Sequence, residues 1–436
     1  MRILRLLIRG CGEVGGEITP APSLWSSITT LLAAAALGGA EVVEIDTLNQ
    51  CISNVLRLLR LLGYNVDKIS TTRLIIRGEE ELTRPLIARL NLDCGLLVAG
   101  PLSVFFALNA PPGSRLILSA RGSEYILSIE PRELKELLSM IGARVWSTHS
   151  VSQYLVIEKR AAPIPRVLRV TTPNAALIAS LLVALPGPMP SRPPLVRLIA
   201  PQLYARERLR YVEALLASTG LDVSIGSESI RLERTSTKSN RLKPLPGVAE
   251  TLTILSYAAP CDVSKIVIKT AALSNDQLQE LQYLVKLIGY DAEAYSDRLE
   301  LSKSSPKAIV YNTEQVPELA IPLIINAFRV GGSAVSGLRP SISEGLVSRH
   351  IESVGKTFGA EAYLEEDERL RVLKPLEKGG ESTMSCRGLD PASCSLVVYG
   401  VLAGRRRAVV DQAEKAINMI PFGLEYLQML GIDISV

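Results

Sequence analysis

The sequence has little net charge and no long hydrophobic run. Across 436 residues the formal net charge is only +4, which is too small to indicate a nucleic acid or an anionic membrane as a partner. The apolar runs around residues 31–37 and 175–186 are too short to span a bilayer. The first residues lack the apolar core and small-residue cleavage site of a signal peptide. We therefore expect a cytoplasmic protein that binds neither nucleic acid nor membrane.

Metal-ligating and thiol motifs are also missing. The two histidines, His149 and His350, have no metal-ligand spacing between them, so no metal site is expected. The six cysteines contain no C-x-x-C pair; they are Cys11, Cys51, Cys94, Cys261, Cys386 and Cys394. We expect them to be buried, unpaired thiols of a protein in a reducing compartment.

A leucine-rich amphipathic segment that ends in glycine recurs along the chain. The glycines are about 70 to 80 residues apart; they are Gly63, Gly142, Gly220, Gly289, Gly359 and Gly431. Each stands where a helix is expected to end in a left-handed residue, a conformation that glycine adopts without steric cost. The sequence therefore predicts six related units.

Each interval also contains one segment of Ala, Ser, Leu and Val with almost no charge. These six segments are 27–37, 102–108, 174–185, 249–259, 318–330 and 392–403. A helix that is apolar all round is a buried helix. Short β-branched runs such as "TRLIIRG" and "KIVIKT" lie between the helices and predict strands. We therefore expect an α/β protein of six βαβαββ units, three in each of two domains. The polar, proline-bearing segment 234–247 near the midpoint is the expected linker.

Six such units, divided three and three, resemble the enolpyruvyl transferases, and among them most closely the 5-enolpyruvylshikimate-3-phosphate (EPSP) synthases. The resemblance covers nearly the whole chain. It implies a two-domain inside-out α/β barrel in which the chain crosses twice between lobes. One lobe would be residues 22–241, and the other residues 1–21 with 242–436.

The resemblance also implies a reaction. In that family the enolpyruvyl group of phosphoenolpyruvate is transferred to shikimate-3-phosphate and phosphate is released, a step of aromatic amino acid biosynthesis. The family needs no metal and no organic cofactor, so none is expected here. The implied partners are small phosphorylated substrates, and the implied state is a monomer.

The loop "PAPSLWSSIT" carries hydroxyl groups into the start of a predicted helix, a natural place for an anion. It aligns with the family's Ser-Lys-Ser loop. Ser23 matches the first serine, but Leu24 stands at the lysine, Trp25 at the second serine and Thr29 at a following arginine. The backbone of an anion loop is expected here without its charged side chains, and Trp25 would plug the emptied site.

Two further substrate-binding motifs are only partly kept. In "LVAGPLSV" Gly100 matches the loop that holds phosphoenolpyruvate, and Val104 stands at its arginine. Gly100 suits either close approach to a ligand or a turn at a helix start. Asn174 aligns with the first position of the family's Ser-Ser-Gln motif, and Asn418 stands at the last family lysine. Ser23, Gly100 and Asn174 are the predicted substrate-binding residues.

Two carboxylates align with the family's catalytic pair. Glu318 in "VPELAIPL" stands at an aspartate that accepts a proton, and Glu344 in "LRPSISEGLVS" stands at the glutamate of the family's Lys-Glu-Ser-Asp-Arg motif. By the resemblance, Glu318 would be the base and Glu344 the acid. The alternative is a helix-start carboxylate for Glu318 and a solvated loop residue for Glu344.

Two functions remain open. The first is an EPSP synthase with an unusual site. The second is a non-catalytic, diverged paralogue that binds another ligand or a partner protein. The absence of every aligned cation favours the second, because each charge-assisted contact to a substrate anion contributes roughly 1.5–3 kcal/mol. RNA 3′-phosphate cyclases use related units, but the sequence has no matching histidine nucleophile motif.

Overall fold

Four-stranded sheets recur along the chain, and all six found in the described residues share one pairing pattern. In each sheet an outer strand runs parallel to its neighbour, and the other two pairings are antiparallel. The structure is a computed structural model. It describes residues 5–78, 84–91, 96–119, 132–149, 153–161, 167–169, 175–185, 195–199, 212–217, 221–225, 229–234, 241–365, 368–377, 379–405 and 407–436.

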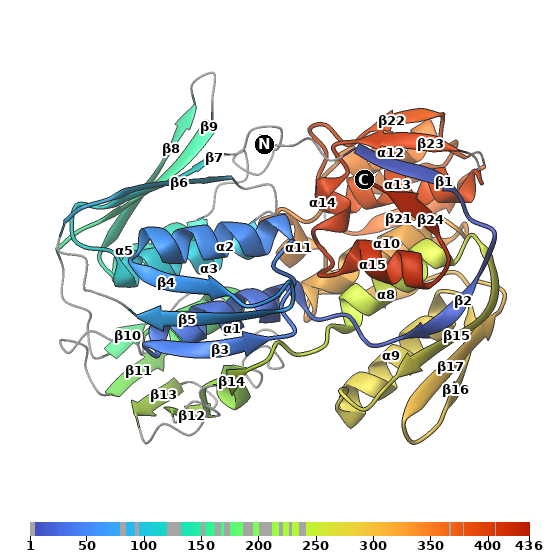
Figure 1. The fold of residues 1–436 in the computed structure, drawn as a ribbon. Coiled ribbons are helices and arrows are strands. Elements are labelled where there is room, and N and C mark those ends of the chain that lie inside the picture. Colours follow the sequence, from blue (N-terminus) through green and yellow to red (C-terminus); the bar gives the residue numbers. More distant parts are fainter. Residues whose placement is uncertain are drawn as a thin grey trace. The chain divides into compact units, whose positions relative to one another are not determined.

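The chain divides into two units, drawn in Figure 1. The first unit comprises Met1–Leu24 and Pro246–Val436, and the second unit comprises Trp25–Leu245. The chain therefore leaves the first unit after Leu24 and returns to it at Pro246. An isolated bridge pairs Pro22 with Pro246, so the leaving and returning segments lie side by side within the first unit.

Three sheets belong to the first unit. Their strands are β22 (Thr383–Ser385), β23 (Ala408–Asp411), β1 (Arg5–Gly10) and β24 (Asp433–Ser435); β16 (Tyr290–Ala294), β17 (Arg298–Lys303), β15 (Asp262–Lys269) and β2 (Glu13–Ile18); and β18 (Val310–Asn312), β19 (Ser333–Ser336), β21 (Leu370–Lys374) and β20 (Glu361–Leu364). The first of these sheets contains strands from both ends of the sequence, and the second pairs β2 with β15. The amino-terminal residues are thus built into the fold of the carboxyl-terminal half.

The other three sheets belong to the second unit. Their strands are β14 (Arg241–Leu242), β3 (Gly39–Val43), β5 (Arg73–Gly78) and β4 (Tyr64–Lys68); β6 (Ile87–Asn91), β7 (Arg115–Ser119), β9 (Gln153–Lys159) and β8 (Ala143–His149); and β10 (Val167–Arg169), β11 (Leu195–Ile199), β13 (Ser229–Arg234) and β12 (Leu221–Ile225). Segment 234–247 was expected to be a linker, but part of it is a strand: Arg241 and Leu242 form β14 and pair with β3. A polar, proline-bearing composition does not exclude a short edge strand, which can tolerate proline nearby.

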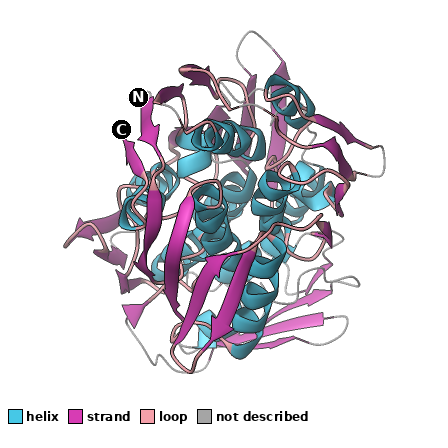
Figure 2. Ribbon diagram, turned by 90° about the vertical axis from the view of Figure 1, so that its right-hand side faces the viewer, coloured by secondary structure: helices cyan, strands magenta, loops and turns pink. Residues whose placement is uncertain are grey.

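All six predicted apolar segments form helices. They are α1 (Leu24–Ala36), α3 (Leu96–Asn109), α6 (Ala175–Ala184), α8 (Val248–Ala258), η1 with α10 (Pro317–Leu319 and Ala320–Ala327) and α13 (Pro391–Ala403). Within the first unit α8, α10 and α13 contact one another. In the view of Figure 2 the helices lie together in the middle and strands surround them. Apolar side chains on every face of these helices explain why they form the interior.

The amphipathic segments form the covering helices. They are α2 (Gln50–Leu61), α5 (Arg132–Met140), α9 (Asn275–Leu287), α12 (His350–Thr357) and α15 (Gly423–Met429), with the short helices α11 (Arg339–Ser343) and α14 (Glu414–Ile417) between elements. Five of the predicted helix-ending glycines have positive φ, from 78° at Gly142 to 93° at Gly289. Gly220 lies outside the described residues. None of the helices found in the described part of the chain is long and apolar enough to cross a membrane.

The cysteines contradict the expectation of free thiols. Cys11 and Cys261 form a disulfide with a Cα–Cα separation of 5.3 Å, and Cys386 and Cys394 form another with 5.1 Å. Cys51 is disulfide-bonded as well. The first bond joins positions 250 residues apart, so only the path of the chain through the fold could reveal it. Disulfides persist in oxidising compartments and in intracellular proteins of hyperthermophiles, which removes the cysteines as an argument for a reducing compartment.

Candidate functional site

The predicted anion loop contacts a carboxyl group of the chain itself. Helix α8 begins after Gly247, and its third residue, Glu250, is 7% exposed. The backbone N–H of Leu24 donates to Glu250 Oε1 at 2.8 Å. The Ser23 hydroxyl is also hydrogen-bonded to the Glu250 carboxyl. One of the N–H groups at the start of α1 is therefore satisfied by a side chain of the same chain.

Gly247 makes room for this carboxyl. A Cβ atom at Gly247 would overlap Glu250 Oε2 and would lie 2.9 Å from the Cα of Ser23. Two further bonds hold the segments together, since Gly247 N–H donates to Ala21 O at 2.7 Å and Ala21 N–H donates to Thr251 Oγ1 at 3.0 Å. The first turn of α8 and the loop before α1 thus form one hydrogen-bonded cluster.

The charge state of Glu250 is perturbed. Burial raises the pKa of its carboxyl to about 7, because the ionised form loses hydration; the Leu24 N–H opposes this rise, and the negative charge of Glu318 adds to it. Glu318 is thereby placed within electrostatic reach of Glu250. Ser23 and Glu318, two of the predicted site residues, both act on Glu250, a residue that the family motifs do not include.

The two predicted catalytic carboxylates lie on connected elements. Glu318 is the middle residue of η1 and is half-buried. Glu344 follows α11, is 4% exposed, and donates its backbone N–H to Pro340 O at 2.9 Å. The hydroxyl of Ser341 on α11 donates to Pro317 O on η1 at 2.9 Å. Glu344 is therefore a buried residue, which contradicts the alternative of a solvated loop glutamate.

A buried aspartate with polar neighbours lies at the start of α13. Asp390 is fully buried and accepts the backbone N–H of Ser393 at 2.9 Å and the hydroxyl of Ser348 at 2.7 Å. Burial raises the pKa of the Asp390 carboxyl. His350 Nδ1 lies 2.9 Å from the Ser348 hydroxyl. These bonds join the segment before α12 to the start of α13.

Lys415 is a buried cation that the sequence analysis did not single out. It is 5% exposed, and its ammonium group donates to Leu389 O at 2.8 Å, next to Asp390. It lies one helical turn before Asn418, the residue aligned with the family lysine. The spacing of Lys415 and Asn418 could have identified it, because side chains three residues apart are neighbours on one helix face.

The other positions aligned with family cations are packing positions. Leu24 and Val104 are fully buried, and Trp25, which stands at the family's second serine, is 3% exposed. Thr29 is also fully buried, and its hydroxyl donates to Trp25 O and Ser26 O, both at 3.0 Å. These side chains fill interior space or bond within their own helix, and none presents a charge to a ligand.

Gly100 and Asn174 are the other two predicted substrate-binding residues. Gly100 lies inside α3, and a Cβ atom there would be 2.8 Å from Cδ2 of Leu177 on α6. The absence of a side chain thus permits close helix packing, and a role of Gly100 in substrate binding stays a prediction. Asn174 lies outside the described residues.

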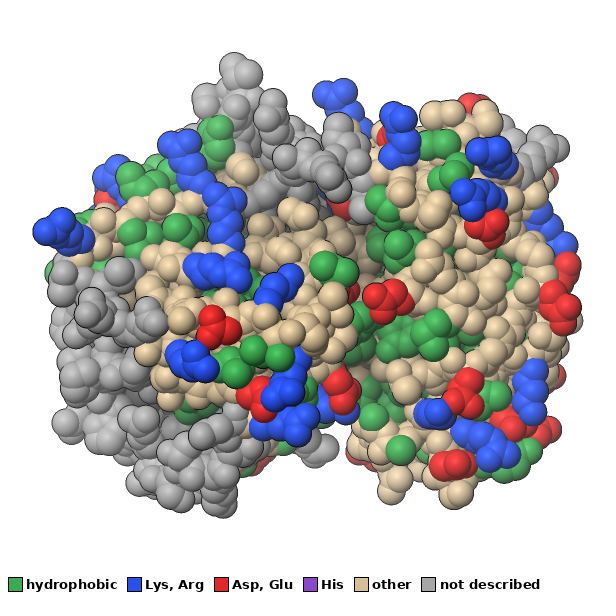
Figure 3. All heavy atoms as spheres, viewed as in Figure 1, with side chains coloured by type: hydrophobic (Ala, Val, Ile, Leu, Met, Phe, Trp, Pro, Cys, Tyr) green, Lys and Arg blue, Asp and Glu red, His purple; other side chains and the backbone are tan. Residues whose placement is uncertain are grey.

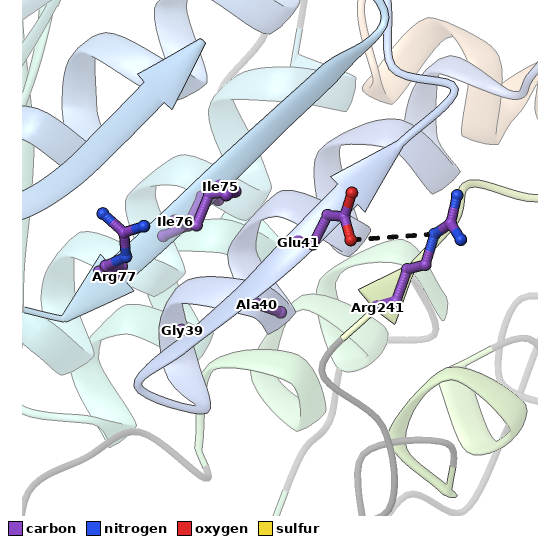
Figure 4. A pocket seen from close by; sticks show the side chains of 7 residues that line it. All are labelled: Gly39, Ala40, Glu41, Ile75, Ile76, Arg77 and Arg241. Atoms are coloured by element: carbon purple, nitrogen blue, oxygen red, sulfur yellow. Dashed lines mark ion pairs between the residues drawn. The ribbon is translucent and has the colours of Figure 1, made fainter. Parts of the chain in front are cut away.

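The second unit also has a groove that none of the predicted site residues lines. It has a volume of about 440 Å³ over β3 and β5, and Figure 4 shows Arg77 and Arg241 at its two ends. Arg77 pairs with Asp67 at 2.7 Å, and Arg241 lies 4.0 Å from Glu41. Glu41 also pairs with Arg73, so the guanidinium groups at this groove are held in ion pairs of the chain itself.

The surface of the first unit has no large field of one sign on the face drawn in Figure 3, where acidic and basic side chains are interspersed. Ion pairs such as Lys265–Glu300 at 2.7 Å contribute to this pattern. Among the residues that the structure describes, no group of three His, Cys, Asp or Glu side chains is placed to hold a metal ion.

Comparison with known proteins gives no match to a family model and no match among curated sequences. Solved structures do match. The enolpyruvyl transferase NikO from Streptomyces tendae has a TM-score of 0.67 at 14% identity, covering 99% of this chain and 98% of that one. An EPSP synthase from Acinetobacter baumannii has a TM-score of 0.65 at 16% identity, covering 99% of both chains.

The chain has the enolpyruvyl transferase fold. The match spans nearly the full length of both proteins, so the likeness includes both units and not one common motif. At 14–16% identity it establishes the fold, while activity has to be argued from side chains. In this chain the loop before α1 contacts a carboxyl group, that of Glu250.

Proposed function

We propose that this protein is a diverged, EPSP synthase-like protein with weak or absent enolpyruvyl transfer, which binds a small molecule carrying fewer negative charges than phosphoenolpyruvate and shikimate-3-phosphate. The observation that carries the proposal is the Glu250 carboxyl bound to Leu24 N–H and Ser23. A carboxyl group thus lies beside Leu24, the residue that aligns with the family's lysine.

Electrostatics support this choice. Bringing two phosphorylated substrates together requires cations, and each charge-assisted contact contributes roughly 1.5–3 kcal/mol. Here Leu24, Thr29 and Val104 are buried packing residues. The loss of three such contacts corresponds to roughly 5–9 kcal/mol, or about four to six decades in affinity or rate.

The carboxyl groups indicate the chemistry of the ligand. Glu250, Glu318 and Glu344 belong to one unit, in which η1 packs against α8 and is hydrogen-bonded to α11. Carboxylates accept hydrogen bonds from hydroxyl and ammonium groups. A neutral or cationic ligand that carries hydroxyl or amino groups therefore suits the site better than a phosphate ester.

The finer architecture belongs to the same proposal. We infer that each sheet is part of one copy of a βαβαββ unit, with three copies per lobe in an inside-out α/β barrel. The support is the shared pairing pattern of the sheets and one apolar helix associated with each. The lobes would be residues 22–241 and residues 1–21 with 242–436.

A second candidate function is an active transferase with a relocated cation. Lys415 favours it, because a buried ammonium group beside Leu389 and Asp390 supplies positive charge near the start of α13. In that case Glu318 would act as the base and Glu344 as the acid, and Lys415 would bind a substrate anion.

Phosphate release with phosphoenolpyruvate and shikimate-3-phosphate tests both candidates, run beside a thermal-shift titration with each compound. We expect no measurable release and little stabilisation, since a ligand present at a concentration equal to its Kd stabilises by only about 0.4 kcal/mol. Phosphate release that is lost in Glu318→Gln and in Lys415→Met, but kept in the exposed control Glu13→Gln, would overturn the proposal in favour of the active transferase.

A further inference from the structure

A chain of hydrogen bonds leads from a buried carboxyl group to a partly exposed imidazole in the first unit. Asp390 is fully buried at the start of α13, and its Oδ2 accepts the hydroxyl of Ser348 at 2.7 Å. The Ser348 oxygen lies 2.9 Å from Nδ1 of His350, the first residue of α12. The side chain of His350 is 44% exposed. A ligand could therefore reach the imidazole end of the chain, while the carboxyl end stays in the interior.

The partners of Asp390 fix the direction of the first hydrogen bond. Its Oδ1 accepts the backbone N–H of Ser393 at 2.9 Å, and its Oδ2 accepts the Ser393 hydroxyl at 2.5 Å as well as that of Ser348. An ionised carboxylate has only acceptor sites, so it accommodates all three donors. Burial raises the pKa of Asp390, and these three donors oppose the rise. The hydroxyl proton of Ser348 is therefore directed at Asp390.

The Ser348 hydroxyl must then accept a proton from His350. A hydroxyl group has one proton to donate and two lone pairs. The proton points to Asp390, and the oxygen also accepts the backbone N–H of His350 at 3.3 Å. A contact of 2.9 Å between this oxygen and Nδ1 needs a proton between them, so Nδ1 carries it. A neutral imidazole has only one protonated ring nitrogen, which makes Nε2 the acceptor.

We propose that Ser348 and Asp390 are positioning residues that hold His350 in its Nδ1-protonated form, so that Nε2 accepts a hydrogen bond, or a proton, from a ligand hydroxyl or ammonium group. In the proton transfer, the O–H or N–H bond of the ligand breaks, its oxygen or nitrogen keeps the electron pair, and the proton binds to Nε2. The Asp390 carboxylate faces the resulting imidazolium, with Oδ2 3.9 Å from Nδ1.

Only the contact with a ligand rests on the proposed function. The position of the imidazole proton is a property of the protein without ligand, so one measurement can be made for each. The same hydrogen bonds could also serve only to hold the starts of α12 and α13 together. Such a purely structural role makes no demand on which ring nitrogen is protonated, and the tautomer therefore distinguishes the two roles.

Nitrogen NMR of the full chain with isotope-labelled histidine measures the tautomer at pH 8.5, where an ordinary imidazole is neutral. The chain has two histidines, so His149→Gln assigns the signals of His350. We expect Nδ1 of His350 to have the chemical shift of a protonated nitrogen and Nε2 that of an unprotonated one. In Ser348→Ala the proton should move to Nε2, the form that histidine side chains favour in water, and Ser348→Thr should restore it to Nδ1.

The matched control is Ser353→Ala on the same helix. The Ser353 hydroxyl is exposed and donates to the backbone carbonyl of His350 at 2.8 Å, so its removal should leave the tautomer unchanged. A proton on Nε2 in the wild type would overturn the proposal even if Ser348→Ala fails to fold. A tautomer that is the same in folded Ser348→Ala as in the wild type would overturn it as well.

Calorimetric binding of shikimate, a hydroxyl-bearing probe, tests the contact with a ligand. Ser348→Ala should weaken binding about two- to tenfold, the effect of one hydrogen bond, and Ser353→Ala should not change it. Equal affinity in the wild type and Ser348→Ala would overturn the assignment of Nε2 to the ligand. No binding to the wild type would contradict the proposed function, and the NMR measurement would still decide whether Ser348 and Asp390 fix the tautomer.

Discussion

The carboxyl of Glu250 and the backbone N–H of Leu24 form a 2.8 Å hydrogen bond although 226 residues separate them in the sequence. This bond joins the start of α1 to the first turn of α8. It explains how a loop with the backbone of an anion site exists without a cation, because the anion is a side chain of the same protein.

The stability of the fold should fall as the pH rises through the range where Glu250 loses its proton. The pKa of Glu250 is raised from 4.5 to about 7, so between these values the folded state binds more protons than the unfolded state. The contribution of Glu250 to the free energy of unfolding is fully present below pH 4.5 and is lost as the pH rises through 7. The expected loss is at most about 3 kcal/mol.

Urea unfolding of the wild type and of Glu250→Gln at pH 5 and pH 8 measures this effect. Because glutamine resembles the protonated carboxyl in shape, the variant should gain stability relative to the wild type only at pH 8. Glu13→Gln, which removes an exposed carboxylate, is the control. A stability difference that is the same at both pH values would contradict the assignment.

Gly247→Ala should displace the Glu250 carboxyl and destabilise the protein by about 1–3 kcal/mol, the usual cost of overpacking. The backbone conformation at Gly247, with φ of −108°, accepts alanine, so the effect is purely steric. Gly12→Ala is the matched control, since a Cβ atom there meets nothing within 4 Å.

A double-mutant cycle sharpens this prediction. In a Glu250→Ala background, Gly247→Ala should cost less, because the atoms that it displaces are gone. Additive free energies of unfolding would indicate that the alanine clashes with Ser23 and not with the Glu250 carboxyl.

Removing each of the two described disulfides should lower the stability of the fold by a different amount. Cys11–Cys261 closes a loop of 250 residues, whereas Cys386–Cys394 closes one of 8. In the chain-entropy model the longer loop contributes about 3 kcal/mol more. Thermal unfolding of the Cys11→Ser/Cys261→Ser and Cys386→Ser/Cys394→Ser variants compares them. Equal losses would argue that native-state packing, and not chain entropy, sets the contribution.

Leu24→Lys should destabilise the fold without creating a phosphoenolpyruvate site. Leu24 is fully buried, so a lysine there must either lose hydration or push its neighbours apart. Leu24→Met keeps the volume and should cost less than about 1.5 kcal/mol. A Leu24→Lys variant that keeps its melting temperature and is stabilised by phosphoenolpyruvate would mean that this position faces a usable anion site.

Local structure was largely predictable from the sequence because it depends on short-range patterns. Apolar residues on all faces identified α8 and α13 as interior helices, and Gly63 and Gly289 marked helix ends through their freedom to adopt positive φ. The carboxylate at Glu318 was also visible, because it lies beside a Pro that opens a helix.

The tertiary structure decided everything that depends on residues distant in the sequence. Glu250 looked like one more polar residue of an apolar helix until the loop before α1 was placed against it. Likewise the spacing of Cys11 and Cys261 gives no hint of their bond, and the burial of Lys415 depends on its contact with Leu389. The sequence by itself determined the repeated secondary structure, since periodicity and glycine are local properties. Only the folded chain determined the charge of the site, because burial and electrostatic partners arise from contacts across more than 200 residues.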